Sequence, residues 1–287
     1  MCINKNKENT RSQSFKLVRE SITILDSFTK LHRKEETKIP NYLKEALELT
    51  EFYAKSYSKF FIRDLELFLK IDTDNKLSSL EKTSINTYLN RKIFDTVAKL
   101  LYVSQFDVLD RGVFILAQLL GDIYFYSENN QTSETYKKLD SDYRDMGKNL
   151  LIKKNVIFPT NNTGLSRKYL KDNNFFFPQT EQILIKLLPV YVKDHSNVSL
   201  NSKQLYKDYS MLSDSIHSGL IANYSTEHLS NYKDIATISV RVRMMLEILN
   251  TYYFNHFLNE KVNQWLESFL SIKDSFLNEY LKVIDSD

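Results

Sequence analysis

The sequence predicts an all-α protein, a multi-helix bundle of about eight to ten helices. Two observations lead to this class. The 287 residues include only 5 glycines and 4 prolines, fewer than in an average protein, so tight turns are rare and the elements between them are long. Apolar side chains also recur at intervals of three and four residues through most of the chain, which is the period of a helix with one buried face.

The first part of the chain shows this pattern from its beginning. Apolar residues at helical spacing from Phe15 to Phe28 predict a first helix. Pro40 suits the first turn of the next one, where a missing backbone N–H costs nothing. Ser78 and Glu81 have the spacing of a capping box, in which two side chains satisfy free backbone N–H groups at a helix start. Helices are therefore expected over residues 12–33, 40–70, 78–103 and 108–126.

The second part continues as helices separated by a connection near its start. Pro189 is expected to end one short helix, because proline cannot donate the hydrogen bond that a helix interior needs. Short strands near 156–158 and 175–177 would be at most a minor two-stranded element, since an isolated pair is marginally stable. The expected helices cover residues 133–153, 166–171, 180–188, 202–217, 227–257 and 259–284.

The chain is expected to form a single helical domain over residues 11–287, preceded by a flexible polar tail at residues 1–10. It contains no internal repeat and no low-complexity tract. A seam within the domain is expected at 155–178, around the connection between helices. The stretch Phe175-Phe-Phe-Pro178 is strongly apolar for a connection, so its side chains are expected to pack at the seam and not to face water.

The N-terminal residues, the lone cysteine and the most apolar stretch bear on the location of the protein and on its contact with membranes. The N-terminal residues lack the apolar stretch of a secretory signal, and the lone cysteine, Cys2, cannot form a disulfide within the chain. Both features favour a cytoplasmic protein. The most apolar stretch, 112–126, is shorter than the ~20 residues of a membrane span and is interrupted by polar side chains, so no membrane partner is expected.

Charge is unevenly distributed along the chain, although the formal net charge is only +3. Residues 146–171 contain no acidic side chain. Cations beside an aromatic ring and a proline-containing loop suit single-stranded nucleic acid, and the alternative is a solvated connection between helices. The candidate nucleic-acid-binding residues are Lys148, Lys153, Lys154, Arg167, Lys168, Tyr169 and Lys171.

Polar side chains also interrupt the apolar helix expected over 108–126. Arg111, Gln118 and Asp122 fall on one side of this helix and form a polar lane that is expected to be buried. A buried guanidinium needs a partner, so Arg111 should face either a carboxylate within the bundle or a bound anion. Arg241 has no partner at helical spacing, whereas Arg243 has Glu247 four residues later and is expected to form a surface pair.

His217 closes the helix expected over 202–217, on the flank of an apolar stripe that includes Leu205 and Tyr209. Ser213 lies one turn before it, but acyl transfer also requires an oxyanion hole and an orienting acid. Asp214 and His217 form a single pair, so no metal site is expected. The sequence lacks the glycine-rich loop of nucleotide hydrolases and indicates no cofactor.

Two short motifs carry a family resemblance: Arg111-Gly-Val-Phe-Ile115 and, further along, Tyr209-x-x-Leu-Ser-x-x-x-His217. Over residues 105–255 the chain resembles a group of bacterial all-helical proteins that has been likened to the HEPN superfamily. The resemblance implies either an RNase or an inert partner in toxin–antitoxin or phage-defence systems. HEPN RNases carry arginine shortly before histidine on one helix; no histidine of this chain does, so Arg111 would have to supply the cation from another helix.

Two functions from different classes fit these observations. The favoured one is an interaction module that contacts another protein or its own copy, because each residue singled out has an adequate structural role. The alternative is a HEPN-like RNase or RNA-binding protein, in which histidine transfers protons and arginine stabilises phosphate charge. Its candidate catalytic residues are His217, Arg111, Ser213, Asp214 and Arg241.

Overall fold

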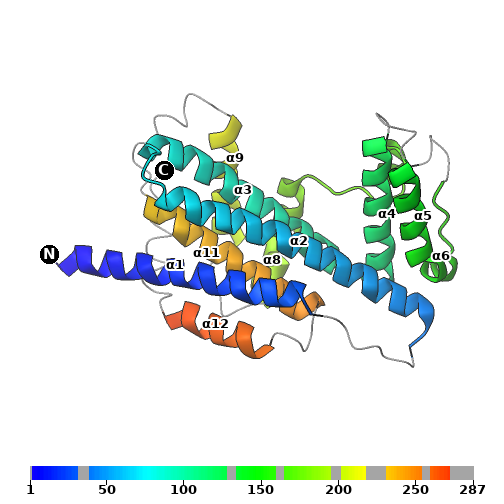
Figure 1. Cartoon of the computed structure of the whole chain (residues 1–287), viewed down its shortest axis with the longest axis horizontal. Helices are drawn as coiled ribbons and strands as arrows, with labels where there is room; N and C mark the ends of the chain where they lie inside the picture. The colour runs from blue at the N-terminus through cyan, green and yellow to red at the C-terminus, as the bar shows by residue number, and fades with distance from the viewer. Residues whose placement is uncertain are drawn as a thin grey trace. The chain divides into compact units, whose positions relative to one another are not determined.

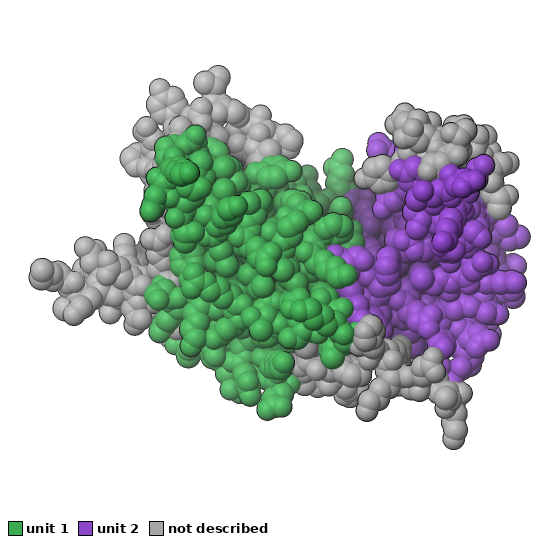
Figure 2. All heavy atoms as spheres, viewed as in Figure 1, with its two compact units in different colours: residues 1–31, 57–101, 179–287 green, residues 32–56, 102–178 purple. Residues whose placement is uncertain are grey.

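The computed structural model describes residues 2–31, 39–127, 134–159, 165–194, 202–217, 231–253 and 259–271. Every regular element in these ranges is a helix, so the predicted all-α class is confirmed for the part of the chain that is described (Figure 1). The chain divides into two compact units, coloured separately in Figure 2. Unit 1 comprises residues 1–31, 57–101 and 179–287, and unit 2 comprises residues 32–56 and 102–178.

Unit 1 contains most of the long helices. Within it α1 lies along both α11 and α12, and α8 lies along α9 (Figure 1). The Trp265 indole of α12 donates a 2.8 Å hydrogen bond to the Leu17 carbonyl of α1, and its ring stacks on Phe269. The elements are α1 (Cys2–Thr29), α8 (Thr180–Asp194), α9 (Ser202–His217), α11 (Asn231–Ile248), the π-helix η1 (Leu249–Tyr253) and α12 (Asn259–Ser271).

Unit 2 is organised around one helix, α4 (Val108–Ser127), which contacts each of its shorter neighbours. An aromatic cluster packs against the first half of α4, with ring centroids of Tyr102, Phe106, Phe114 and Phe177 lying 5.0 to 5.8 Å apart. The neighbours are α5 (Glu134–Met146), α6 (Lys148–Lys154) and α7 (Arg167–Asp172). Two long helices contribute to both units: α2 (Asn41–Thr73) and α3 (Ser79–Ser104).

Helix starts that carry a local signal begin where the sequence predicts. The Pro40 carbonyl accepts hydrogen bonds from the first turn of α2. At α3 the Ser78 N–H donates to Glu81 Oε2 over 2.8 Å, and the Glu81 N–H donates back to Ser78 Oγ over 3.3 Å, which confirms the capping box. The Ser78 hydroxyl also donates to Glu81 Oε2 over 2.7 Å, and this bond, followed by that from the Ser78 N–H, lowers the pKa of Glu81. α1 differs, because it begins at Cys2 and not near residue 12.

The sequence prediction that Pro189 ends a helix is wrong. α8 continues through Pro189 to Asp194. Pro189 is exposed, so its ring meets solvent, while Leu188 and Tyr191 on either side are buried. Packing of this apolar face outweighs the hydrogen bond that proline cannot donate.

A single helix was expected over 133–153, but the chain forms α5 and α6 with a break at Gly147. A Cβ atom at Gly147 would lie 2.4 Å from Leu116 Cδ2 of α4. Because glycine has no Cβ atom, the backbone at Gly147 can lie close to α4. The periodicity of the segment does not reveal this close approach.

α6 and α7 end in the same way. Asn155 and Asn174 adopt left-handed conformations with φ of 53° and 59°. In each case the asparagine N–H and the following N–H donate to carbonyls of the last turn, which is the Schellman motif. Both turns lead into a similar sequence, Asn155-Val-Ile-Phe-Pro159 and Asn174-Phe-Phe-Phe-Pro178. This local repeat was missed at the sequence level because only five residues carry it.

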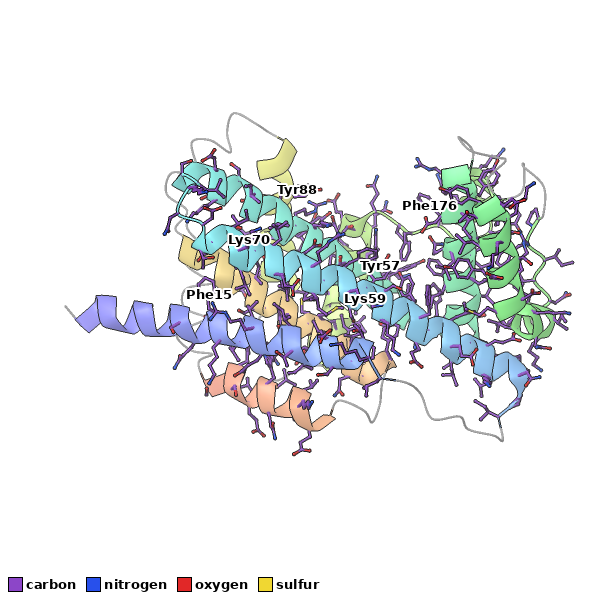
Figure 3. All side chains as sticks on the ribbon, in the orientation of Figure 1. Phe15, Tyr57, Lys59, Lys70, Tyr88 and Phe176 are labelled. Carbon is purple, nitrogen blue, oxygen red and sulfur yellow. The ribbon has the colours of Figure 1, made fainter. Side chains whose placement is uncertain are left out.

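The expected seam at 155–178 belongs to unit 2, and its end coincides with the passage of the chain from unit 2 to unit 1 after Pro178. Part of its apolar stretch packs within unit 2: Phe175 contacts Phe158, with ring centroids 5.6 Å apart, and Phe177 joins the aromatic cluster. Phe176, labelled in Figure 3, is 45% exposed. No strand forms among the residues described at either end of this segment.

Candidate functional site

Arg111 lies in the first turn of α4, in unit 2, and is buried. Its Nη2 donates to the carbonyl oxygens of Ser104 and Phe106 over 3.1 and 3.0 Å. Ser104 is the last residue of α3, where carbonyls lack partners within the helix. Arg111 therefore caps the end of α3 with a positive charge. From the sequence, Arg111 was expected to face a carboxylate or a bound anion, and backbone carbonyls were not considered.

The start of α4 is held by a second charged group. Asp107 Oδ1 accepts hydrogen bonds from the N–H groups of Leu109 and Asp110, both over 2.9 Å. The bond from the Asp110 N–H is the main cause that lowers the pKa of Asp107. Asp107 is thus an N-cap, and it orients the helix turn from which Arg111 extends.

The polar lane of α4 is buried only in its first part. Arg111 is buried and Gln118 is half-buried, where its Nε2 donates to the Phe175 carbonyl. Asp122 is exposed, which corrects the expectation that the whole lane is buried. Its carboxylate lies near the end of α4, where water can solvate the charge. Arg111 and Gln118 thus connect α4 to the residues that precede it and to a segment that follows it in the chain, all within unit 2.

Arg241 lies on α11, in unit 1, and is 1% exposed. Its guanidinium forms an ion pair with Asp208 of α9, and its Cζ lies 4.6 Å from the centroid of the Phe94 ring on α3. A buried cation is therefore compensated by one carboxylate and by the face of one aromatic ring. The contacts join three helices that are far apart in the sequence.

Asp208 is the residue of this cluster that sequence analysis missed. It is buried and lies three residues after Leu205, on the apolar face of α9 that was correctly predicted from Leu205 and Tyr209. A carboxylate on an apolar face is a signal for a buried ion pair. Its partner could not be identified, because Arg241 follows 33 residues later on another helix.

Tyr209 extends the same cluster toward the surface. Its hydroxyl accepts a hydrogen bond from the Arg91 guanidinium, whose Cζ also lies 3.8 Å from the centroid of the ring. The ring packs edge-on against Phe94 with centroids 5.6 Å apart. Burial raises the pKa of Tyr209. Arg91 also pairs with Asp95, so two arginines in this cluster each have a carboxylate partner.

Arg243 pairs with Glu247 over 2.9 Å, as their spacing predicts. The expectation that this pair lies on the surface is wrong, since both residues are buried. The Arg243 Cζ lies 5.4 Å from the Phe269 ring centroid of α12, and the Tyr191 hydroxyl of α8 donates to Glu247. Neighbouring helices therefore cover a pair that the sequence of α11 alone would leave in solvent.

Three candidate catalytic residues are on α9. His217 is its last residue, and the side chains of His217, Ser213 and Asp214 lie outside the described residues. Of the two arginines proposed to act with His217, Arg111 belongs to unit 2 and Arg241 to unit 1. A catalytic pairing with either arginine stays a prediction.

The basic segment has both engaged and exposed cations. Lys154 pairs with Asp110, which raises the pKa of Lys154. Lys153 Nζ lies 5.2 Å from the Tyr42 ring centroid, and Arg167 Cζ lies 5.3 Å from that of Phe125. The candidate residues that are exposed are Lys148, Lys153, Arg167, Lys168 and Lys171, whereas Lys154 and Tyr169 are half-buried. Residues 160–164 lie outside the described residues.

Within the described ranges, no three histidine, cysteine, aspartate or glutamate side chains form a group that could hold a metal ion. That the protein functions without a metal ion or a cofactor stays a prediction. Among the same residues, no helix combines the length and the apolar character that crossing a bilayer requires.

Comparisons of this chain with protein-family models, with curated proteins and with solved structures give no match. The resemblance to HEPN proteins is therefore neither supported nor contradicted by them. The candidate site is defined by the geometry of the chain itself: a buried charged cluster on α3, α9 and α11 in unit 1, and a capped helix junction around Arg111 in unit 2.

Proposed function

We propose that this protein is a non-enzymatic helical interaction module, which contacts another protein or its own copy. The observation that supports this best is the engagement of its buried arginines. Arg111 donates to two carbonyl oxygens, and Arg241 pairs with Asp208 beside the Phe94 ring. A cation that stabilises charge during RNA cleavage must face the phosphate. These guanidinium groups face partners within their own units.

The energetic cost of releasing these cations supports the same proposal. Arg241 is 1% exposed and Arg111 is 7% exposed. To reach a phosphate, Arg241 would have to leave Asp208 buried without its partner, which costs about 3–5 kcal/mol. Arg111 would have to leave two carbonyl oxygens without a donor. Both arginines are thus better suited to holding helices together than to catalysis. A cytoplasmic location, which the N-terminal residues and the lone cysteine favour, and a toxin–antitoxin or phage-defence setting, which the sequence resemblance implies, belong to the same proposal.

An RNA cleavage assay tests the proposal. Wild-type protein, His217→Ala and the control His32→Ala would be incubated with single-stranded RNA labelled at one end, and the fragments separated on a gel. We expect no cleavage by any of the three proteins. Cleavage by wild type and His32→Ala that His217→Ala abolishes, with an unchanged thermal unfolding midpoint, would overturn the proposal in favour of the RNase. If no cleavage is seen, sedimentation of wild-type protein over a concentration range would test self-association. A protein that stays monomeric would point to another protein as the partner.

A further inference from the structure

Two exposed isoleucines lie on either side of the turn that ends α6. Ile152 and Ile157 are 70% and 83% exposed, the largest values among the bulky apolar side chains that the structure describes. A solitary apolar residue on a surface is ordinary. Here two exposed isoleucines lie at one turn, in the segment 146–171 that contains no acidic residue. This combination of apolar side chains and a basic segment gives the turn a surface of distinct composition.

The backbone that carries these isoleucines is held in place. The Asn155 N–H donates to the Ile152 carbonyl over 3.1 Å, and the Val156 N–H donates to the Leu151 carbonyl over 3.0 Å. The Tyr169 hydroxyl donates to the Ile157 carbonyl over 3.3 Å. The turn therefore has a defined conformation in which both side chains point outward.

The residues that follow hold Ile157 in the same orientation. Phe158 is 3% exposed and packs on Phe175. The Arg144 guanidinium donates to the carbonyls of Phe158 and Pro159 over 3.1 and 2.8 Å. Because successive side chains of an extended chain point in opposite directions, the burial of Phe158 directs Ile157 into solvent.

Three exposed lysines belong to the same segment as the two isoleucines. Lys148 lies one helical turn before Ile152 on the exposed face of α6, and Lys153 follows Ile152 directly. Lys168 precedes Tyr169, whose hydroxyl bonds to Ile157. All three lysines are exposed. We call this set, Lys148, Ile152, Lys153, Ile157 and Lys168, the basic apolar surface.

We infer that the basic apolar surface binds an acidic amphipathic segment of a partner protein. The inference rests on the proposed function and deepens it by naming the chemistry of the partner. The lysines match carboxylates, and the isoleucines match aliphatic side chains on the same face of the partner segment. A preformed backbone lowers the entropic cost of docking.

The same surface is less suited to single-stranded RNA, whose bases stack on flat rings. Isoleucine offers no flat ring. Two aromatic residues adjoin this surface in the sequence: Phe158 is buried, and Tyr169 is half-buried with its hydroxyl bonded to the backbone. The aliphatic character of the exposed groups therefore favours a protein partner.

Fluorescence anisotropy of labelled probes on the full chain tests the inference. The first probe is a synthetic peptide of glutamate, alanine and leucine, with the leucines at helical spacing. The second is polyglutamate with the same number of glutamates as the first peptide, the third is oligouridylate, and phosphatidylcholine–phosphatidylglycerol vesicles measured by sedimentation are the fourth. We expect the leucine-containing peptide to bind about tenfold more tightly than polyglutamate, because only it buries the isoleucines.

Matched variants separate the two components of the surface. Ile152→Ser combined with Ile157→Ser should weaken binding of the leucine-containing peptide about tenfold and leave polyglutamate binding unchanged. Ile185→Ser, at a 58% exposed isoleucine of α8, is the control and should change neither. Lys148→Glu combined with Lys168→Glu should weaken both peptides, and Lys203→Glu, at an exposed position of α9, should weaken neither. Thermal unfolding midpoints should be unchanged throughout.

The inference is overturned if the leucine-containing peptide binds no more tightly than polyglutamate, or if the double isoleucine variant binds it as wild type does. Preferential binding of oligouridylate or of the vesicles also overturns it. These outcomes concern the surface alone. The proposed function is judged separately by cleavage of RNA that depends on His217.

Discussion

Unit 1 neutralises its most buried arginine with a carboxylate, whereas unit 2 places its buried arginine against carbonyl oxygens. Asp208 supplies a full negative charge to Arg241 from a helix distant in the sequence. Ser104 and Phe106 supply partial charges to Arg111 from the turn directly before its own helix. The partners in the first arrangement lie 33 residues apart in the sequence, and those in the second lie seven and five residues apart.

This difference has an energetic consequence. Removing a carboxylate from a buried pair leaves a full charge without compensation, whereas removing Arg111 takes a donor from the two neutral carbonyls that it contacts. Unit 1 should therefore be more sensitive than unit 2 to the loss of one member of its arginine contact.

The largest effect is expected for Asp208→Asn. The substitution keeps the shape of the side chain but leaves the Arg241 charge buried without its counter-charge. We expect the free energy of unfolding to fall by about 3–5 kcal/mol, measured by urea denaturation followed by circular dichroism. Replacing both partners, with Asp208→Leu and Arg241→Met, should restore most of the loss because no buried charge remains. A cost below about 1 kcal/mol for Asp208→Asn would contradict the comparison.

Arg111→Met should have a smaller effect. It keeps much of the aliphatic length and removes the donor to the Ser104 and Phe106 carbonyls. We expect a loss of about 2 kcal/mol in the same denaturation measurement. Arg19→Met, at an exposed position of α1, is the control and should change stability by less than about 0.5 kcal/mol. If Arg111→Met lowers the free energy of unfolding as much as Asp208→Asn does, unit 1 is not more sensitive than unit 2 to the loss of its arginine contact.

Tyr191→Phe examines the second buried pair of unit 1. It removes the hydroxyl that donates to Glu247, while Arg243 remains on the other carboxylate oxygen. We expect a loss of about 1 kcal/mol, because the charge of Glu247 is still compensated. Tyr88→Phe, at a 58% exposed tyrosine of α3 labelled in Figure 3, should have no measurable effect. Equal effects of the two substitutions would show that the Tyr191 hydroxyl does not stabilise the pair.

Asp107→Ala should have an effect of about the same size as Tyr191→Phe, and it should depend on pH. At neutral pH the loss of this N-cap should cost about 1 kcal/mol. The pKa of Asp107 in the folded chain lies below its ordinary value of 3.8, chiefly because the Asp110 N–H bonds to the carboxylate. The stabilisation is therefore complete above that ordinary value and is lost as the pH falls through the folded pKa. The difference between wild type and variant, followed by urea denaturation, should shrink below about pH 4; a constant difference would rule out this role.

Local signals account for the parts of the fold that were predicted well. The helix starts after Pro40 and Ser78 and the full extent of α9 follow from residues within one or two turns of each boundary. The helix end at Pro189 was wrongly predicted because burial of Leu188 and Tyr191 overrides the preference of proline.

The candidate site was predicted less completely. Arg241 was correctly singled out as a helix cation without a local partner, but Asp208 was missed because nothing in the local pattern of α9 indicates which helix will face it. The pairing of Arg243 with Glu247 follows from their spacing. Its burial does not, because Phe269 comes from another helix.

By itself, the sequence determined the helical class, several helix boundaries and the apolar face of α9, because these depend on hydrogen bonds and spacing within a few residues. Only the tertiary structure decided which charges are buried and what compensates them. Burial depends on the helices that cover a side chain, and those helices can come from any part of the chain. The contacts that assign Arg241 to Asp208 and Arg111 to the end of α3 are therefore properties of the folded arrangement.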